Sequence, residues 1–155
     1  MRKIFLIFVF TTACAQTVGT SSNLNVSTDF SQETTNSVDA NLIYENEFGE
    51  LITQNLTTKK TMIVFWADYW GICREELPLL ENKLDELSEE YNILALAHSE
   101  VEPTMEWVQN NLNGSLQIGF STKDLRDSLQ VVGQPITVIF DTNGNIISRE
   151  FGYIP

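Results

Sequence analysis

The chain has 155 residues, which is enough for one domain and too few for two. Hydrophobic residues make up 43% and charged residues 19%, a balance typical of a soluble globular domain. With 21 acidic against 9 basic residues the formal net charge is -12, which argues against nucleic acid or anionic lipid as a partner, because both require a basic surface.

The first 15 residues are predicted to be an export signal. A positive stretch (residues 1–3) precedes an apolar run (residues 4–10) that is too short to span a bilayer. Residues 11–14 (TTAC) resemble a lipobox in which Cys14 would carry the lipid, although the first threonine replaces the usual leucine. Residues 13–15 (ACA) also fit an ordinary signal peptidase site, so a lipoprotein and simple secretion both remain open. In either case the chain is expected in the periplasm or anchored in the cell envelope.

Residues 16–40 are predicted to be a disordered tether. They are rich in Ser, Thr and Asn, and their few apolar residues are isolated. Such a segment cannot bury enough surface to offset the entropy lost on ordering. The folded domain is therefore expected over residues 41–155. Its only cysteine is Cys73, so no disulfide framework is predicted there.

The folded part is predicted to open with a hairpin and a buried strand. Residues 42–44 and 51–52 flank a turn signal at residues 48–50. Residues 62–67 (MIVFWA) then form a continuous apolar run, which is typical of a strand buried on both faces.

A long amphipathic helix is predicted next, because apolar residues recur three and four apart. These residues are Leu77, Leu80, Leu84, Leu87 and Tyr91. Stepping back four positions from Leu77 reaches Cys73, which is therefore expected on the inward face of the first turn. Pro78 lies inside this helix and predicts a kink there.

The middle of the domain is predicted to contain one strand and two helices. Residues 92–97 (NILALA) form a second buried strand. A helix is expected from Pro103 to the Asn-Gly pair at residues 113–114. A third helix is expected from a capping box at residues 121–124 as far as Val132.

The last elements predict a hairpin that completes the sheet. Residues 136–140 form a third buried strand, residues 143–144 (NG) form a turn, and residues 146–151 form the return strand. Strand–helix–strand units make right-handed parallel crossovers, whereas the hairpin adds antiparallel strands. The fold class is therefore α/β, with a mixed central sheet and flanking helices.

Two separate motifs resemble the TlpA/ResA-type thioredoxin-like proteins. Residues 62–78 (MIVFWADYWGICREELP) resemble the family's active-site stretch, FWAxWCxPCRxExP, and residues 132–137 (VGQPIT) resemble its loop with a cis-proline, here Pro135. The resemblance covers about residues 41–153. It implies a thioredoxin-like fold and a tethered or periplasmic thiol-disulfide oxidoreductase, often serving cytochrome maturation or envelope redox balance. It also implies protein or peptide thiol partners and no cofactor.

The chain departs from the family pattern at several positions. On this alignment Trp70 takes the place of the attacking cysteine, and Cys73 matches only the resolving cysteine. Ile72 stands where proline is common, and Val64 stands where these proteins often have Asn or Asp. Little or no dithiol redox activity is therefore expected. The family usually continues into a final helix, whereas this sequence ends at Pro155, just after the predicted return strand. Either the chain is a fragment that lacks this helix, or that face of the sheet is covered otherwise.

Two functions remain open. The first is a peptide- or partner-binding module, in which a peptide would pair with the backbone beside the cis-proline. Its predicted binding residues are Tyr69, Trp70, Gly71, Ile72, Gln134 and Pro135. The alternative is a single-thiol oxidoreductase, in which Cys73 would be catalytic because the helix dipole lowers its pKa. Against that, Cys73 can also be a small buried apolar residue, and Trp70 can be a plug that covers it.

Two other chemistries find little support. His98, the only histidine, falls at the end of the second predicted strand and is expected to be a surface residue. Together with Cys73 it is two ligands short of a closed zinc site, so no metal is predicted. Cys73 and Glu76 form the C-x-x-E pattern of some peroxidases, but Trp70 stands where those enzymes need Thr or Ser.

Overall fold

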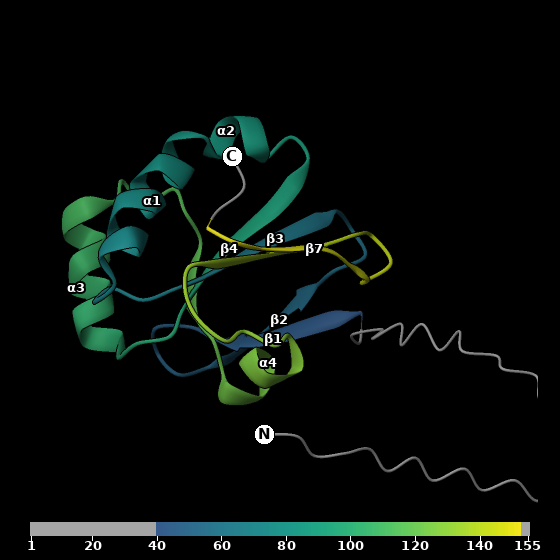
Figure 1. Cartoon of the computed structure of the whole chain (residues 1–155), viewed down its shortest axis with the longest axis horizontal. Helices are drawn as coiled ribbons and strands as arrows, with labels where there is room; N and C mark the ends of the chain where they lie inside the picture. Colours follow the sequence, from purple (N-terminus) through teal and green to yellow (C-terminus); the bar gives the residue numbers. More distant parts are fainter. Residues whose placement is uncertain (1–39, 153–155) are drawn as a thin grey trace, which may run out of the picture. The chain divides into compact units, whose positions relative to one another are not determined.

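A seven-stranded mixed sheet forms the centre of the computed structural model, which describes residues 40–152 (Figure 1). The strands are β1 (Asn41–Glu45), β2 (Leu51–Asn55), β3 (Lys60–Trp66), β4 (Tyr91–Ala97), β5 (Ile118–Phe120), β6 (Ile136–Phe140) and β7 (Ile146–Phe151). The helices are α1 (Gly71–Asn82), α2 (Leu84–Leu87), α3 (Val101–Asn111) and α4 (Lys123–Ser128). The expected α/β class with a mixed sheet is confirmed. The predicted export signal with Cys14, nearly all of the predicted tether, and Pro155 lie outside the described residues.

The strand order explains which helices share a face of the sheet. The order is β2-β1-β5-β4-β3-β6-β7, in which β3, β4 and β5 pair in parallel. The two predicted hairpins, β1–β2 and β6–β7, lie at the sheet's edges and are confirmed. The parallel crossovers from β3 to β4 and from β4 to β5 run through α1 and α3, which pack on one face of the sheet. The chain then returns past β3 to β6, which places α4 on the other face (Figure 1).

Two apolar clusters fill the two faces accordingly. The first joins Cys73, Leu77 and Leu80 of α1 and Val108 of α3 to one side of β3 and β4. The second joins residues of α4, such as Leu125, to the other side of the sheet. Cys73 therefore lies on the inward face of α1, as its spacing from Leu77 predicts.

The prediction of a single long helix after β3 is wrong beyond the third turn of that helix. α1 continues through Pro78 to Asn82, so the interruption falls five residues after the predicted kink, at Lys83. Leu84 starts the four-residue helix α2, and Tyr91 is the first residue of β4. The apolar spacing nevertheless looks continuous, because the residues beyond the break pack on the same cluster as α1.

Three further boundaries differ from the predictions. Helix α3 starts two residues before Pro103, which is tolerated in a first turn because its missing N–H would have no helical partner there. Thr122, rather than residue 121, caps α4, and its side-chain oxygen accepts a hydrogen bond from Leu125 N at 3.1 Å. Because α4 ends at Ser128, Val132 lies beyond the helix and is 85% exposed.

Strand β5 was not predicted at all, because it is short and contains a glycine. A Cβ on Gly119 would lie 2.5 Å from the Tyr44 ring, so only glycine fits this strand beneath that side chain. The glycine removes the apolar signal from a strand of three residues.

Candidate functional site

The two motifs that are far apart in the sequence lie side by side in the structure. Gln134 Nε2 donates a hydrogen bond to Tyr69 Oη at 3.4 Å, which joins the loop before β6 to the loop before α1. The peptide bond between Gln134 and Pro135 is cis, and Gly152 N donates to Pro135 O at 2.9 Å. The two predicted motifs are therefore in direct contact.

Cys73 lies in the first turn of α1 and has no exposed surface. Burial raises the pKa of its thiol, and the negative charge of Glu76 raises it further. A hydrogen bond with the backbone of Ala67 lowers the pKa but by less than burial raises it. At neutral pH the thiol is therefore protonated and inaccessible, which favours the buried apolar interpretation over an activated thiolate.

Trp70 immediately precedes α1 and occupies the N-cap position. Its backbone is extended there (φ -98°, ψ 117°), and its side chain makes no capping hydrogen bond. Its backbone N–H donates to Ala67 O at 3.1 Å, and its carbonyl accepts from Arg74 N at 3.2 Å, so the main chain is fixed. The indole is 45% exposed, so part of its surface is available to a partner. Val64, behind this site, is buried.

Exposed apolar side chains border the site on three segments of the chain. They are Tyr69, Trp70, Ile72, Val132 and Phe151, and together they are called the apolar rim below. A Cβ on Gly133 would lie 3.6 Å from the Phe151 ring, so the end of β7 packs against the cis-proline loop. Sequence reasoning missed Val132 and Phe151, because it placed the first in a helix and treated the second only as a strand residue.

A buried polar network holds the β3–α1 loop in place. Thr104 Oγ1 donates to Asp68 Oδ1 at 3.3 Å, and it lies 2.8 Å from Ser99 Oγ. Arg74 Nε donates to the carbonyl oxygen of Asp68. The loop that carries Trp70 is thus fixed both to the first turns of α3 and to α1.

His98 follows β4 and lies at the margin of the site. It is exposed, as predicted, and its backbone N–H donates to Trp66 O at 2.8 Å. Burial of part of the ring lowers the pKa of His98, and the charge of Arg126 lowers it further, whereas a hydrogen bond with Gln134 acts in the opposite direction. Between residues 40 and 152 no group of three or more potential ligands could hold a metal ion.

Comparison with known proteins identifies the fold. Neither a protein-family model nor a curated protein sequence matches the chain. StoA from Bacillus subtilis matches with a TM-score of 0.63 and 18% identity, covering 76% of this chain and 92% of that one. The exposed lipoprotein thioredoxin of Streptococcus pneumoniae matches with a TM-score of 0.63 and 20% identity, covering 75% and 92%. The thioredoxin domain of a thiol-disulfide oxidoreductase from Bacteroides vulgatus matches with a TM-score of 0.62 and 20% identity, covering 77% and 89%.

The described residues therefore have a thioredoxin-like fold, as the two motifs predicted. The same set of similar structures includes thiol:disulfide interchange proteins. Within residues 40–152, no helix is both long enough and apolar enough to cross a bilayer.

Proposed function

We propose that this thioredoxin-fold chain is an exported protein that binds an extended peptide or protein partner and performs little or no dithiol exchange. One observation carries the proposal: a fully buried thiol and a half-exposed indole share the start of α1. Thiol–disulfide exchange needs an accessible thiolate at such a position, whereas binding needs an exposed apolar surface.

The cis-proline loop offers a backbone for such a partner. Within the described residues, Val132, Gly133 and Gln134 have no backbone hydrogen-bond partner. Backbone polar groups in a folded protein are normally paired with protein or water. An extended peptide placed along this loop would pair with these groups by β-augmentation, while its side chains contact the apolar rim.

Export and the nature of the partner belong to the same proposal. Residues 1–15 have the pattern of an export signal, and one similar structure is described as an exposed lipoprotein. A lipidated Cys14 would tether the domain to the envelope membrane. Several similar structures are thiol-disulfide exchange proteins, so the proposed partner is an envelope protein or peptide with a thiol or disulfide.

An insulin-reduction assay with dithiothreitol tests the redox half of the proposal. A chain carrying Cys14→Ser, which leaves Cys73 as its only thiol, should not accelerate the reaction, and adding Cys73→Ser should change nothing. In the folded protein Cys73 should not react with a thiol reagent, whereas in denaturant it should react fully. Turnover that depends on Cys73 would instead support the alternative function, a single-thiol oxidoreductase in envelope redox homeostasis or cytochrome maturation.

A peptide titration tests the binding half. The probe is the reduced and alkylated insulin B chain, an unfolded polypeptide without free thiols. Trp70→Ala should weaken its binding by at least about tenfold, since buried aromatic anchors dominate interfaces. Phe48→Ala is the matched control, because Phe48 is 78% exposed on the β1–β2 turn, outside the rim. Equal effects of the two substitutions, or no binding by the wild type, would contradict the proposal.

Restoring the missing cysteine tests the alignment on which both halves depend. In the Cys14→Ser background, Trp70→Cys should form a disulfide with Cys73 and gain insulin reductase activity, because the two positions are three residues apart at a helix start. Ile72→Cys is the control, because it adds an exposed thiol on the same turn that should not pair with Cys73. If Trp70→Cys does not oxidise, the alignment of this loop is wrong.

A further inference from the structure

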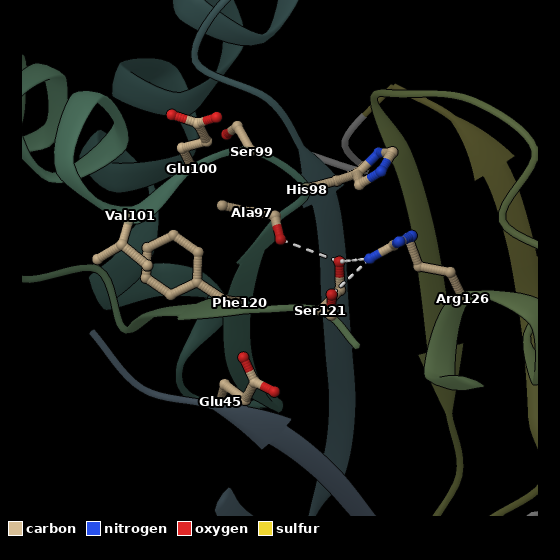
Figure 2. Close-up of a pocket in the computed structure, with 9 residues that line it drawn as sticks. All are labelled: Glu45, Ala97, His98, Ser99, Glu100, Val101, Phe120, Ser121 and Arg126. Atoms are coloured by element: carbon tan, nitrogen blue, oxygen red, sulfur yellow. Dashed lines mark hydrogen bonds between the residues drawn. The ribbon is translucent and has the colours of Figure 1, made fainter. Parts of the chain in front are cut away.

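A pocket of about 340 Å³ lies outside the apolar rim, at the carboxyl ends of β4 and β5 (Figure 2). Helix α3 leaves β4 toward one face of the sheet, whereas α4 leaves β5 toward the other. Such a divergence opens a crevice at the end of the strands, where α/β proteins commonly bind ligands. The volume lies at the lower end of the range for small-molecule sites, about 300–1,000 Å³.

Arg126 supplies the positive charge of this pocket and has no acidic partner within the described residues. Its Nη1 donates to the carbonyl oxygen and to Oγ of Ser121, the latter at 3.1 Å. Ser121 Oγ in turn donates to Ala97 O at 2.9 Å, so the guanidinium is held by a fixed chain of hydrogen bonds. The ion pairs between residues 40 and 152 are Lys60–Glu90 and Lys123–Asp127, neither of which includes Arg126.

Arg74 and Arg149 also lack an acidic partner within the described residues, but Arg126 is the arginine that lines this pocket. A guanidinium has five N–H donors, and the contacts with Ser121 involve only Nη1. The remaining donors suit a carboxylate, which guanidinium groups bind in a bidentate manner. The pocket therefore has a pre-oriented site for an external carboxylate.

His98 lies beside Arg126, and Ser99, two carboxylates and apolar surface line the rest of the pocket. Figure 2 shows Glu45 and Glu100 at two separate margins, away from Arg126. No basic side chain in the described part of the chain pairs with either carboxylate. Val101 and Phe120 form an apolar wall opposite Arg126. A ligand that complements Arg126, the glutamates and the apolar side chains of the pocket carries a carboxylate, an ammonium group and an apolar portion.

We infer that this pocket binds a free amino acid with an apolar side chain. Its carboxylate would pair with Arg126, its ammonium group would face the carboxylate of one of the two glutamates, and its side chain would contact Val101 and Phe120. A simple anion would use only the positive charge of the pocket, and a simple amine would use only its negative charge. No residue of the apolar rim lines the pocket, although His98 of the pocket contacts Gln134. The inference therefore does not depend on peptide binding at the rim.

Three ligands with the same branched apolar body test the inference by calorimetric titration of the full chain. L-leucine carries both charges, 4-methylpentanoate carries only the carboxylate, and 3-methylbutylamine carries only the ammonium group. Leucine should bind at least about tenfold more tightly than either analogue, because each analogue lacks one charged hydrogen-bonding group. If leucine does not bind, or binds no better than the analogues, the inference is overturned.

Variants of the pocket identify where leucine binds. Arg126→Met keeps the apolar stem and should weaken leucine binding by at least about tenfold, whereas the matched control Arg149→Met, on exposed β7, should not. The double variant Glu45→Gln/Glu100→Gln gives a second measurement that leaves Arg126 and its contacts with Ser121 in place. It should weaken leucine binding but leave 4-methylpentanoate binding unchanged or stronger. Leucine binding that is unaffected by both changes would overturn the inference.

Discussion

Cys73 lies in the first turn of α1 and His98 directly follows β4, and at both residues the protein disfavours the charged form. Burial is the largest cause in each case: it raises the pKa of the Cys73 thiol and lowers the pKa of the His98 imidazole. Neighbouring charges act in the same direction, Glu76 on the thiol and Arg126 on the imidazole. A site for thiolate chemistry needs an accessible thiol with a lowered pKa, so the buried Cys73 does not favour that chemistry.

The pKa of His98 can be measured without ambiguity, because it is the only histidine in the chain. An NMR titration should give a value below 6.5, and Arg126→Met should raise it by removing a nearby positive charge. Arg149→Met is the control and should leave it unchanged. A lowered native pKa means that the unfolded chain binds the proton more readily. The contribution of His98 to stability is therefore full above pH 6.5 and decreases as the pH falls toward the native pKa.

A value of 6.5 or above for His98, or no response to Arg126→Met, would contradict this electrostatic description.

For single residues, the sequence predicted the positions that the periodicity of one helix determines, such as the inward position of Cys73. It did not predict the pocket around Arg126. Arg126 comes close to Ser121 and His98 only when β4, β5 and α4 have packed together, and no local sequence pattern predicts this proximity.

Helix α1 is joined to the α3–β5 connection by a single buried carboxylate. Glu81 is 7% exposed and accepts hydrogen bonds from four consecutive backbone N–H groups. The donors are Asn113 at 2.8 Å, Gly114 at 3.2 Å, Ser115 at 3.1 Å and Leu116 at 3.3 Å. An ionised carboxylate accepts hydrogen bonds and donates none, so both of its oxygens match a segment of the backbone that presents only N–H donors.

Replacing this carboxylate should destabilise the fold. In Glu81→Gln one oxygen becomes an NH₂ group, which turns a donor toward backbone donors. Hydrogen bonds to charged groups are worth about 1.5–3 kcal/mol each, so we expect a loss of about 2 kcal/mol in the free energy of unfolding. Urea denaturation measures this loss in the free energy of unfolding, and Glu86→Gln on exposed α2 is the control. Equal stability of the two variants would show that the buried contacts contribute little.

The close contact between β1 and β5 gives a second stability test. Gly119→Ala would place a Cβ 2.5 Å from the Tyr44 ring, so we expect a loss of about 1–3 kcal/mol from overpacking. Gly71→Ala is the matched control, because no atom lies within 4 Å of the Cβ position there. It starts α1, so the substitution should leave stability unchanged or raise it. Thermal unfolding of both variants measures the difference, and an equally stable Gly119→Ala protein would contradict the packing described.

The elements that the sequence predicted each carry a local signal. The strands β3, β4 and β6 are apolar runs, and the β6–β7 hairpin has its Asn-Gly turn. The break at Lys83 has no such signal, since apolar residues on both sides of it pack on one cluster. Strand β5 lacks one as well, because its pairing with β1 and β4 requires Gly119 beneath Tyr44. The errors therefore fall where tertiary packing, rather than local periodicity, determines the backbone.

The charge of the whole molecule limits which partners the apolar rim can accept. A net charge of -12 gives the protein a negative field that repels polyanions and attracts basic partners. Apolar contact with the rim and long-range attraction are separate contributions, since the first determines affinity at short range and the second mainly determines the association rate. For the proposed partner we therefore expect an extended segment that carries apolar side chains for the rim and positive charge beside them.

Two peptides with one apolar core and different flanks test this preference. The peptide flanked by lysines should associate faster than the peptide flanked by glutamates at about 20 mM salt, and the difference should shrink by about 300 mM as screening increases. Trp70→Ala should weaken both peptides equally, because it removes an apolar contact and no charge. Stopped-flow fluorescence measures the rates, with a serine-flanked peptide as the neutral reference. If the glutamate peptide associates as fast as the lysine peptide at low salt, the field of the molecule does not select its partner, and the apolar rim alone does.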